Sequence, residues 1–194
     1  MKRLLLALMA IVLAACEGVP VREMAGVEWE QHRLSVSQLD SWVLRGRLAV
    51  HYDNEGGQGI LYWQQDYDAY ELRLMDPLGR QLMQISGDNT HARMLTREAE
   101  VFESASAEGL MQNYLGWSVP VNALNQWVRG MPEPGMNVEE TRLEHGRLSF
   151  LNQEGWLIEY QAYEQVGMVW LPRRLKITTP DLNLKLIVEE WNLS

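Results

Sequence analysis

The chain has 194 residues, 46% hydrophobic and 22% charged, which is the size and composition of an ordinary globular protein with one large domain or two small ones. Its formal net charge of −9 argues against a nucleic-acid partner, because binding to a phosphate backbone needs a surplus of Lys and Arg on one face. The same acidic balance gives no support for electrostatic attraction to anionic lipid.

The first fifteen residues have the pattern of a secretory signal peptide. Lys2 and Arg3 are positive, positions 4–13 form an unbroken apolar run, and small residues follow at positions 14 and 15. The apolar run is far shorter than the roughly 20 residues that a spanning helix needs. Removal of residues 1–15 would leave 15 basic and 26 acidic side chains, a formal charge of −11.

The sequence Leu-Ala-Ala-Cys at residues 13–16 resembles the bacterial lipobox, whose cysteine is lipidated and becomes the mature N-terminus. Cys16 is the only cysteine and cannot form an internal disulfide, so we expect it to be lipidated. Several acyl chains would anchor the protein stably, since each buried CH₂ contributes about 0.8 kcal/mol. The next residue is Glu17, whereas an aspartate at this position would resemble an inner-membrane retention signal. The sequence therefore implies that the protein is located on the periplasmic face of the outer membrane.

A tether at residues 16–27 is expected to lead into a short helix. The helix is predicted over residues 28–39, where Trp29, Val36 and Leu39 are spaced for one face. We expect residues 28–194 to form a single domain after this tether.

From Ser41 onward the hydrophobic period shifts towards two, which predicts strands. Gly46 marks a position where a close approach or a bend is needed, and the glycine-rich residues 54–59 predict a hairpin loop. Consecutive strands follow at such close spacing that no crossover helix fits between them. The sheet must therefore be antiparallel.

Two short helices are predicted to interrupt the strands at about residues 104–130. Ser104 is a suitable N-cap and Gly116 a suitable stop for the first, and the second is expected from about Val121 to Arg129. Their narrow apolar faces suggest that they form a lid over another surface.

Strands resume after the helices and continue to the C-terminus, which gives about ten in all. In the last segment Leu182, Leu184, Leu186 and Val188 alternate with mostly polar residues. We therefore expect one face of this strand to be buried and the other to be exposed to solvent. About ten twisted strands tend to curl or to split into a sandwich. The predicted fold is mainly β, with a curved antiparallel sheet, short helices plugging one opening, and an N-terminal helix.

No pattern in the sequence indicates a reaction centre. The histidines at positions 32, 51, 91 and 145 lack the spacing of a helical zinc site, and Ser118 lies in "GWSVP", which lacks the second glycine of a nucleophile elbow. We therefore expect no enzyme activity, no metal and no cofactor other than the lipid on Cys16. The chain has instead eight Trp, seven Tyr and ten Met, which suit core packing and, equally, broad apolar walls.

Several segments, taken in order, resemble the LolB family of outer-membrane lipoproteins. They cover nearly the whole chain and comprise the lipobox at Cys16, "LRGRLAV" at 44–50, "GILYWQQ" at 59–65, "YELRLMDPLG" at 70–79, "VPVNALNQWVRGMP" at 119–132, and the closing "LPRRL" and "LKLIVEEW". One departure is Asp76, where a neutral Asn is as readily expected.

The resemblance implies a half-open antiparallel β-barrel with a helical lid over an apolar cavity for acyl chains. It also implies a task, in which the protein accepts lipoproteins from the soluble periplasmic carrier LolA and places them in the inner leaflet of the outer membrane. Its partners would be a LolA-like carrier, acylated cargo and outer-membrane lipid, and we expect a monomer. Leu78, between Pro77 and Gly79, matches the leucine of a protruding loop held to act in membrane insertion. The expected cavity residues are Trp63, Leu72, Leu74 and Met83 from the sheet, and Leu110, Tyr114 and Trp127 from the lid.

Two alternatives stay open at this point. One is an envelope hydrolase tethered through Cys16, whose catalytic residues are distant in sequence. The other is an assembly scaffold that is anchored by lipid and binds a protein partner through an apolar groove.

Overall fold

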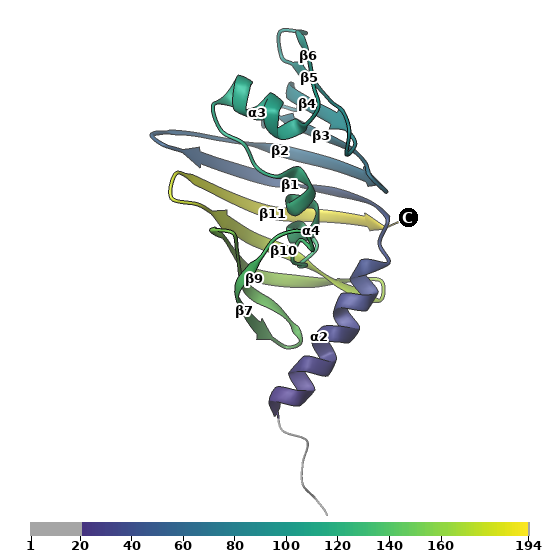
Figure 1. Cartoon of the computed structure of the whole chain (residues 1–194). Coiled ribbons are helices and arrows are strands. Elements are labelled where there is room, and N and C mark those ends of the chain that lie inside the picture. The colour runs from purple at the N-terminus through teal and green to yellow at the C-terminus, as the bar shows by residue number, and fades with distance from the viewer. Residues whose placement is uncertain (1–20, 194) are drawn as a thin grey trace, which may run out of the picture.

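The computed structural model describes residues 21–193 (Figure 1). The signal segment 1–15, Cys16 and the first residues of the tether lie outside this range. Within it the chain forms three helices and one eleven-stranded sheet. The helices are α2 (Val21–Ser37), α3 (Ala107–Leu115) and α4 (Val121–Val128). The strands are β1 (Ser41–Tyr52), β2 (Glu55–Asp66), β3 (Ala69–Met75), β4 (Gln81–Gly87), β5 (Ala92–Thr96), β6 (Val101–Ser104), β7 (Val138–Glu144), β8 (Arg147–Gln153), β9 (Trp156–Val166), β10 (Val169–Thr178) and β11 (Leu182–Leu193).

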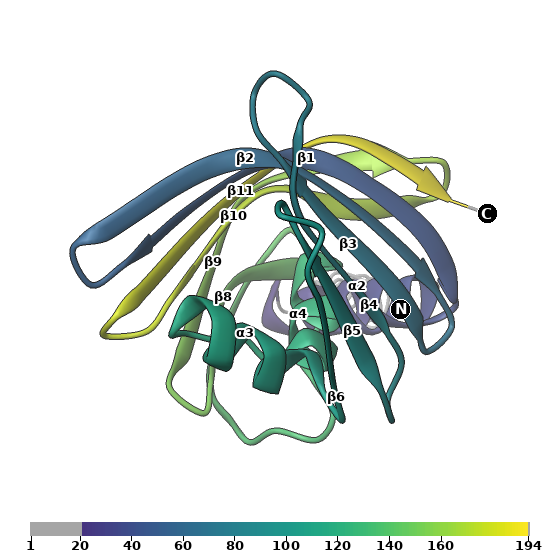
Figure 2. The same cartoon turned by 90° about the horizontal axis from the view of Figure 1, so that it is seen from above.

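All the strand pairs are antiparallel, and the sheet has the order β6-β5-β4-β3-β2-β1-β11-β10-β9-β8-β7. Strands β6 and β7 are its two edges and do not pair with each other, so the curved sheet stays open on one side. Figure 2 shows the sheet arching over the helices, which lie on its concave side. The predicted half-open barrel with a helical lid is confirmed.

The centre of the sheet is the pairing of β1 with both β2 and β11. The register of β1 against β11 shifts between Arg45 and Gly46, as expected at a bulge. A Cβ atom at Gly46 would lie 2.5 Å from the carbonyl oxygen of Ile187. The close approach predicted at this glycine is therefore present.

The core lies between the concave face of the sheet and the helices. In β11, Leu182, Leu184, Leu186 and Val188 are all buried, as the alternation predicts. Trp42 also lies in this core, with its ring centroid 5.1 Å from that of Trp63 and 5.2 Å from that of Trp191.

Residues 60–63 of β2 are apolar on both faces, and the structure shows which face is inward. Leu61 and Trp63 are buried in the core. Tyr62 lies on the opposite face, where the guanidinium carbon of Arg73 is 4.3 Å from the centroid of its ring. On the convex side, the ring of Tyr62 is therefore covered by an arginine of the neighbouring strand β3 and not by a helix.

Two predicted helix starts were wrong, and one strand was not predicted. The first helix begins at Val21, so part of the expected tether is helical. The N-cap of α3 is Ser106, not Ser104, and its hydroxyl accepts a hydrogen bond from Gly109 N. Strand β6 is an additional strand whose first three residues are exposed, so its sequence has no alternation of buried and exposed positions that would have revealed it.

Helix α2 lies against β7, β8 and β10 and places His32 between two aromatic rings. The ring centroids of Trp29 and Tyr163 are 5.9 Å and 6.3 Å from that of His32. Burial lowers the pKa of His32 to about 4, and the charge of Arg147 adds to this shift. His32 is therefore neutral at pH 7 within the packed interface of α2.

Candidate functional site

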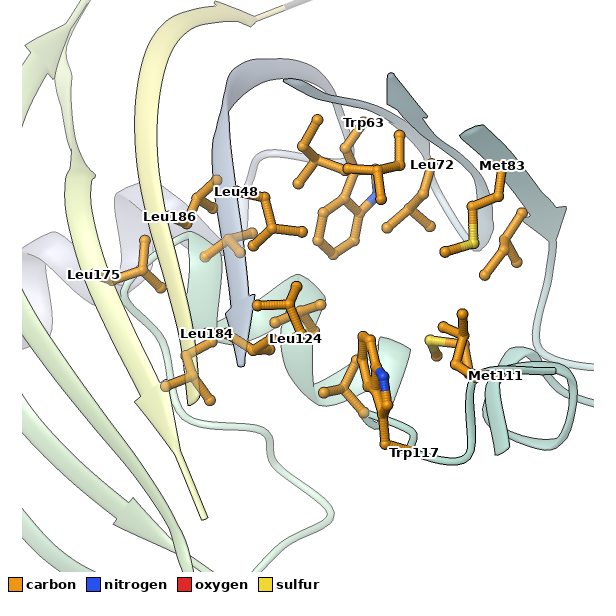
Figure 3. Close-up of a pocket in the computed structure, with 18 residues that line it drawn as sticks. Leu48, Trp63, Leu72, Met83, Met111, Trp117, Leu124, Leu175, Leu184 and Leu186 are labelled. Atoms are coloured by element: carbon orange, nitrogen blue, oxygen red, sulfur yellow. The ribbon is translucent and has the colours of Figure 1, made fainter. Parts of the chain in front are cut away.

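An apolar cavity lies between the concave face of the sheet and the two lid helices (Figure 3). Six strands each contribute two residues separated by one position, so that both side chains point to the same face. These residues are Leu48 and Val50, Leu61 and Trp63, Leu72 and Leu74, Met83 and Ile85, Leu175 and Ile177, and Leu184 and Leu186.

The opposite wall of the cavity comes from the lid, which we define as α3, α4 and the connecting residues 116–120. Each helix contributes two residues four positions apart, which lie on one face of a helix. The lid residues are Met111 and Leu115 from α3, Trp117 and Val119 from the connection, and Leu124 and Val128 from α4. In Figure 3, Leu72 and Met83 of the sheet face Met111 and Trp117 across the cavity.

The cavity wall is apolar in chemistry as well as in residue type. The polar atom of Trp63 is its indole N–H, and this group donates a 3.1 Å hydrogen bond to Oε1 of the buried Gln65. In this conformation the cavity has a volume of about 110 Å³. Such a wall favours hydrocarbon and offers little directional bonding to distinguish one chain from another.

A second hollow continues from the cavity to the surface, and we call it the mouth. It has a volume of about 260 Å³. Its lining combines cavity residues with the start of β2 and with Leu82 of β4, namely Leu48, Val50, Tyr52, residues 55–59, Leu74, Leu82, Met83, Leu115 and Trp117. The glycine-rich segment 54–59, expected to be a hairpin loop, therefore lies mainly in β2 and forms one side of the mouth.

The lid is fastened at its α4 end. Trp127 Nε1 donates to Gln153 Oε1 at 2.9 Å, and the hydroxyl of Tyr160 donates to the carbonyl of Trp127 at 3.0 Å. The buried Arg129 donates from Nη1 to the carbonyl of Leu39 at 3.0 Å. The two helices are joined by Glu108, whose carboxylate accepts a 2.6 Å hydrogen bond from Val121 N at the uncapped start of α4.

Residues 76–80, which we call the tip loop, connect β3 to β4. Figure 2 shows this connection standing out beyond the convex side of the sheet. Leu78 is 79% exposed at its apex, and Gly79 has a left-handed φ of 81°. The position of Leu78 at an exposed turn is as expected from its flanking Pro77 and Gly79.

Comparison with known proteins decides the family. A family model described as outer membrane lipoprotein LolB matches residues 40–191. The chain belongs to the LolB family. It is 35% identical over 185 residues to the outer-membrane lipoprotein LolB of Pseudomonas fluorescens, and the match covers 93% of this chain and 90% of the relative.

Solved structures share the fold of this LolB-family chain. A DUF1329-family protein from Desulfovibrio piger matches with a TM-score of 0.58 at 5% identity, covering 88% of this chain and 93% of that one. A LolA-superfamily protein from Nitrosomonas europaea matches with a TM-score of 0.50 at 8% identity, with coverages of 88% and 93%. At such low identities these likenesses concern the fold alone.

The structure places four of the seven expected cavity residues in the cavity wall and three outside it. Trp63, Leu72, Leu74 and Met83 line the cavity of this LolB-family chain. Leu110 is buried in the core without reaching the cavity, and Tyr114 is 43% exposed with its ring 5.9 Å from that of Phe102. Trp127 is fully buried and points to Gln153, because its indole N–H needs an acceptor that the apolar cavity lacks.

The lid residues that do line the cavity were missed for a specific reason. On α3 the cavity face holds Met111 and Leu115, which are four positions apart, and Leu110 and Tyr114 lie one position before each. The apolar stripe of α3 was thus found, but its inward direction was not. Trp117 was not among the expected cavity residues, although a large aromatic residue between two apolar helices is itself an indication of packing.

Two further observations concern residues 21–193 only. No group of three or more His, Asp or Glu side chains in this range could hold a metal ion. No helix in the same range is long and apolar enough to cross a membrane.

Proposed function

We propose that this outer-membrane lipoprotein accepts acylated lipoproteins from a LolA-like periplasmic carrier, holds their acyl chains in the cavity, and inserts them into the inner leaflet of the outer membrane. Its own anchor would be the lipid on Cys16. The observation that carries the proposal is the cavity itself, whose eighteen lining residues are all apolar or aromatic.

The energetics of acyl chains explain why such a cavity is needed. Three chains of about fifteen CH₂ groups each would cost on the order of 35 kcal/mol to expose to water, at about 0.8 kcal/mol per CH₂. Transfer without a nucleotide must therefore move the chains between similar apolar surroundings with no exposed intermediate. A wall without directional polar groups suits this task, because selectivity for one chain geometry would oppose release.

The lid must open for this cargo. A water molecule needs about 10–15 Å³ of such cavity volume, so the cavity of about 110 Å³ has room for roughly ten groups of that size. Three acyl chains contain several times as many CH₂ groups. The fastening of α4 through Trp127 and Arg129 supports an opening in which α3 moves, since α3 lies against the edge strand β6 and its neighbour β5.

We further propose that Leu78 enters the apolar layer of the outer membrane during delivery. The tip loop leaves β3 after Met75, which pairs with Ile60 beside the mouth residue Gly59. The mouth and the tip loop therefore lie at the same end of the sheet. This arrangement supports release of cargo from the mouth close to the bilayer that Leu78 contacts.

Native mass spectrometry tests the central step. The mature chain with Cys16→Ala is incubated with carrier loaded with a triacylated lipoprotein and then separated from the carrier. We expect a one-to-one complex with the acylated cargo and none with the same cargo lacking its acyl chains. Recovery of the chain without any acylated species would contradict the proposal.

A further inference from the structure

We propose that Asp76 is the residue that positions Leu78, by folding the tip loop around its own carboxylate so that the leucine side chain is held outward. The inference rests on the function proposed above for Leu78. It also gives the acidic residue at position 76 a role, although a neutral Asn is as readily expected there.

The Asp76 carboxylate lies at the centre of the tip loop and not at its apex. Its Oδ1 accepts hydrogen bonds from Leu78 N at 2.9 Å and from Arg80 N at 3.0 Å. Its Oδ2 accepts a 2.6 Å hydrogen bond from Arg80 Nε, which also makes an ion pair. The Asp76 side chain is only 12% exposed, whereas Leu78 is 79% exposed. The carboxylate of Asp76 thus points into the tip loop, and the side chain of Leu78 points to solvent.

The backbone of the tip loop completes the same network. Asp76 N donates to the carbonyl of Arg80 at 2.9 Å, and Gly79 N donates to the carbonyl of Asp76 at 2.9 Å. Pro77 has no N–H to satisfy. Every backbone N–H from residue 76 to residue 80 therefore has an acceptor within the loop itself.

Internal satisfaction of these donors matters for a loop that approaches hydrocarbon. Water cannot bond to backbone groups there, and each unpaired N–H opposes insertion. The Asp76 carboxylate supplies the acceptor for two of the four N–H groups, and the ion pair with Arg80 leaves the loop without net charge. The loop can thus present Leu78 to an apolar layer without leaving a backbone N–H unpaired.

The same contacts keep the carboxylate ionised. The hydrogen bond from Arg80 N is the largest influence that holds the pKa of Asp76 below its ordinary value, and bonds from the Arg80 side chain and Leu78 N act in the same direction. Partial desolvation of the carboxyl acts the other way and is outweighed. Asp76 therefore remains an acceptor at any pH near neutral.

The test compares acceptance with delivery in four variants of the mature Cys16→Ala chain. These variants are Asp76→Ala, Asp76→Asn, Leu78→Ala and the double change Asp76→Ala with Leu78→Ala. Acceptance is measured as transfer of a fluorescent triacylated lipoprotein from a loaded carrier. Delivery is measured as its transfer to vesicles of phosphatidylethanolamine and phosphatidylglycerol. Thermal unfolding verifies that each variant is folded.

We expect Asp76→Ala to accept cargo as the parent chain does and to deliver it several-fold more slowly. Asp76→Asn should deliver at a rate between those of Asp76→Ala and the parent chain. Its amide oxygen can accept from Leu78 N and Arg80 N as Oδ1 does, but its NH₂ group cannot accept from Arg80 Nε, so the charge of Arg80 loses its partner. In the Leu78→Ala background, Asp76→Ala should cause no further loss, since a positioning residue acts only through the residue it positions.

Parent-like delivery by Asp76→Ala, or an equal loss with and without Leu78, would overturn the inference while leaving the proposed function intact. A loss of acceptance together with delivery would also overturn it, because the effect would then not belong to the last step. Parent-like delivery by Leu78→Ala is a different result, which would overturn the role of Leu78 and this inference with it.

Discussion

Trp127 and Gln153 form a buried hydrogen bond that holds the second lid helix on the sheet. The indole Nε1 of Trp127 donates to Oε1 of Gln153 at 2.9 Å, and both residues have no exposed surface. Gln153 also accepts from Glu133 N and donates from Nε2 to the carbonyls of Glu133 and Met136. One side chain of β8 therefore fixes both the end of α4 and the loop that follows it.

Replacement of this glutamine should be costly. Gln153→Leu removes the partners of two buried donors and two carbonyls, and each unsatisfied buried group costs about 1–3 kcal/mol. We expect the free energy of unfolding to fall by about 2–4 kcal/mol, measured by urea denaturation. Gln165→Leu is the matched control, because Gln165 is exposed and should change stability by less than about 0.5 kcal/mol. Equal losses in the two variants would contradict the role of Gln153.

The burial of His32 predicts a loss of stability in mild acid. Its pKa is about 4 in the folded chain against an ordinary value of 6.5, and its Nε2 is buried without a hydrogen-bond partner. The unfolded chain therefore binds more protons than the folded chain between these two values. Stability should be complete above pH 6.5 and should fall as the pH is lowered towards 4.

His32→Phe should remove part of this pH dependence and keep the contacts with Trp29 and Tyr163. Between pH 7 and pH 5 we expect the parent chain to lose about 1 kcal/mol more stability than the variant, a value reduced for the partial exposure of the ring. Urea denaturation at the two pH values measures the difference. The same loss in both proteins would show that protonation of His32 does not oppose folding.

Leu115 and Tyr114 are neighbours on α3 that test which face of the lid meets hydrocarbon. Leu115 lines both the cavity and the mouth, whereas Tyr114 lies outside both. Leu115→Gln should weaken binding of a fluorescent fatty-acid probe by about tenfold, because an apolar contact is replaced by a polar one. Tyr114→Gln should bind the probe like the parent chain. A larger effect at Tyr114 than at Leu115 would place the binding surface elsewhere.

A charge at the apex of the tip loop should block delivery alone. Leu78→Glu should leave folding and acceptance of cargo intact and slow delivery to vesicles by at least about tenfold, because a carboxylate opposes entry into the apolar layer. Met168→Glu is the control, since Met168 is 95% exposed in the turn between β9 and β10, at the opposite end of the sheet. Failure of Leu78→Glu to accept cargo, or equal slowing by both variants, would show that Leu78 has no specific role in delivery.

The sequence was sufficient for the architecture because the strands alternate clearly and are joined by short turns. It was insufficient for β6, since an exposed edge strand of four residues has no periodic pattern. It was also insufficient for the direction of the lid helices. A helix of nine residues such as α3 carries too few apolar positions to show which side of its stripe faces a cavity.

The same contrast holds for the site residues. Trp63, Leu72, Leu74 and Met83 could be predicted because alternation in a strand fixes the face of every second residue. The role of Trp127 depends on Gln153, which lies 26 positions away, and no local pattern reports such a partner. The inward turn of Asp76 likewise depends on the folded shape of the tip loop.

Photo-cross-linking from inside the cavity tests most directly whether acyl chains occupy it. A benzophenone amino acid is placed at Leu124, which lines the cavity, or at Asn122 on the exposed side of α4, and each chain is loaded from a carrier with a triacylated lipoprotein. We expect a cross-link from position 124 to the acyl chains, none from position 122, and none when the cargo lacks its acyl chains. Equal cross-linking at the two positions, or cross-linking that does not depend on acylation, would contradict the account.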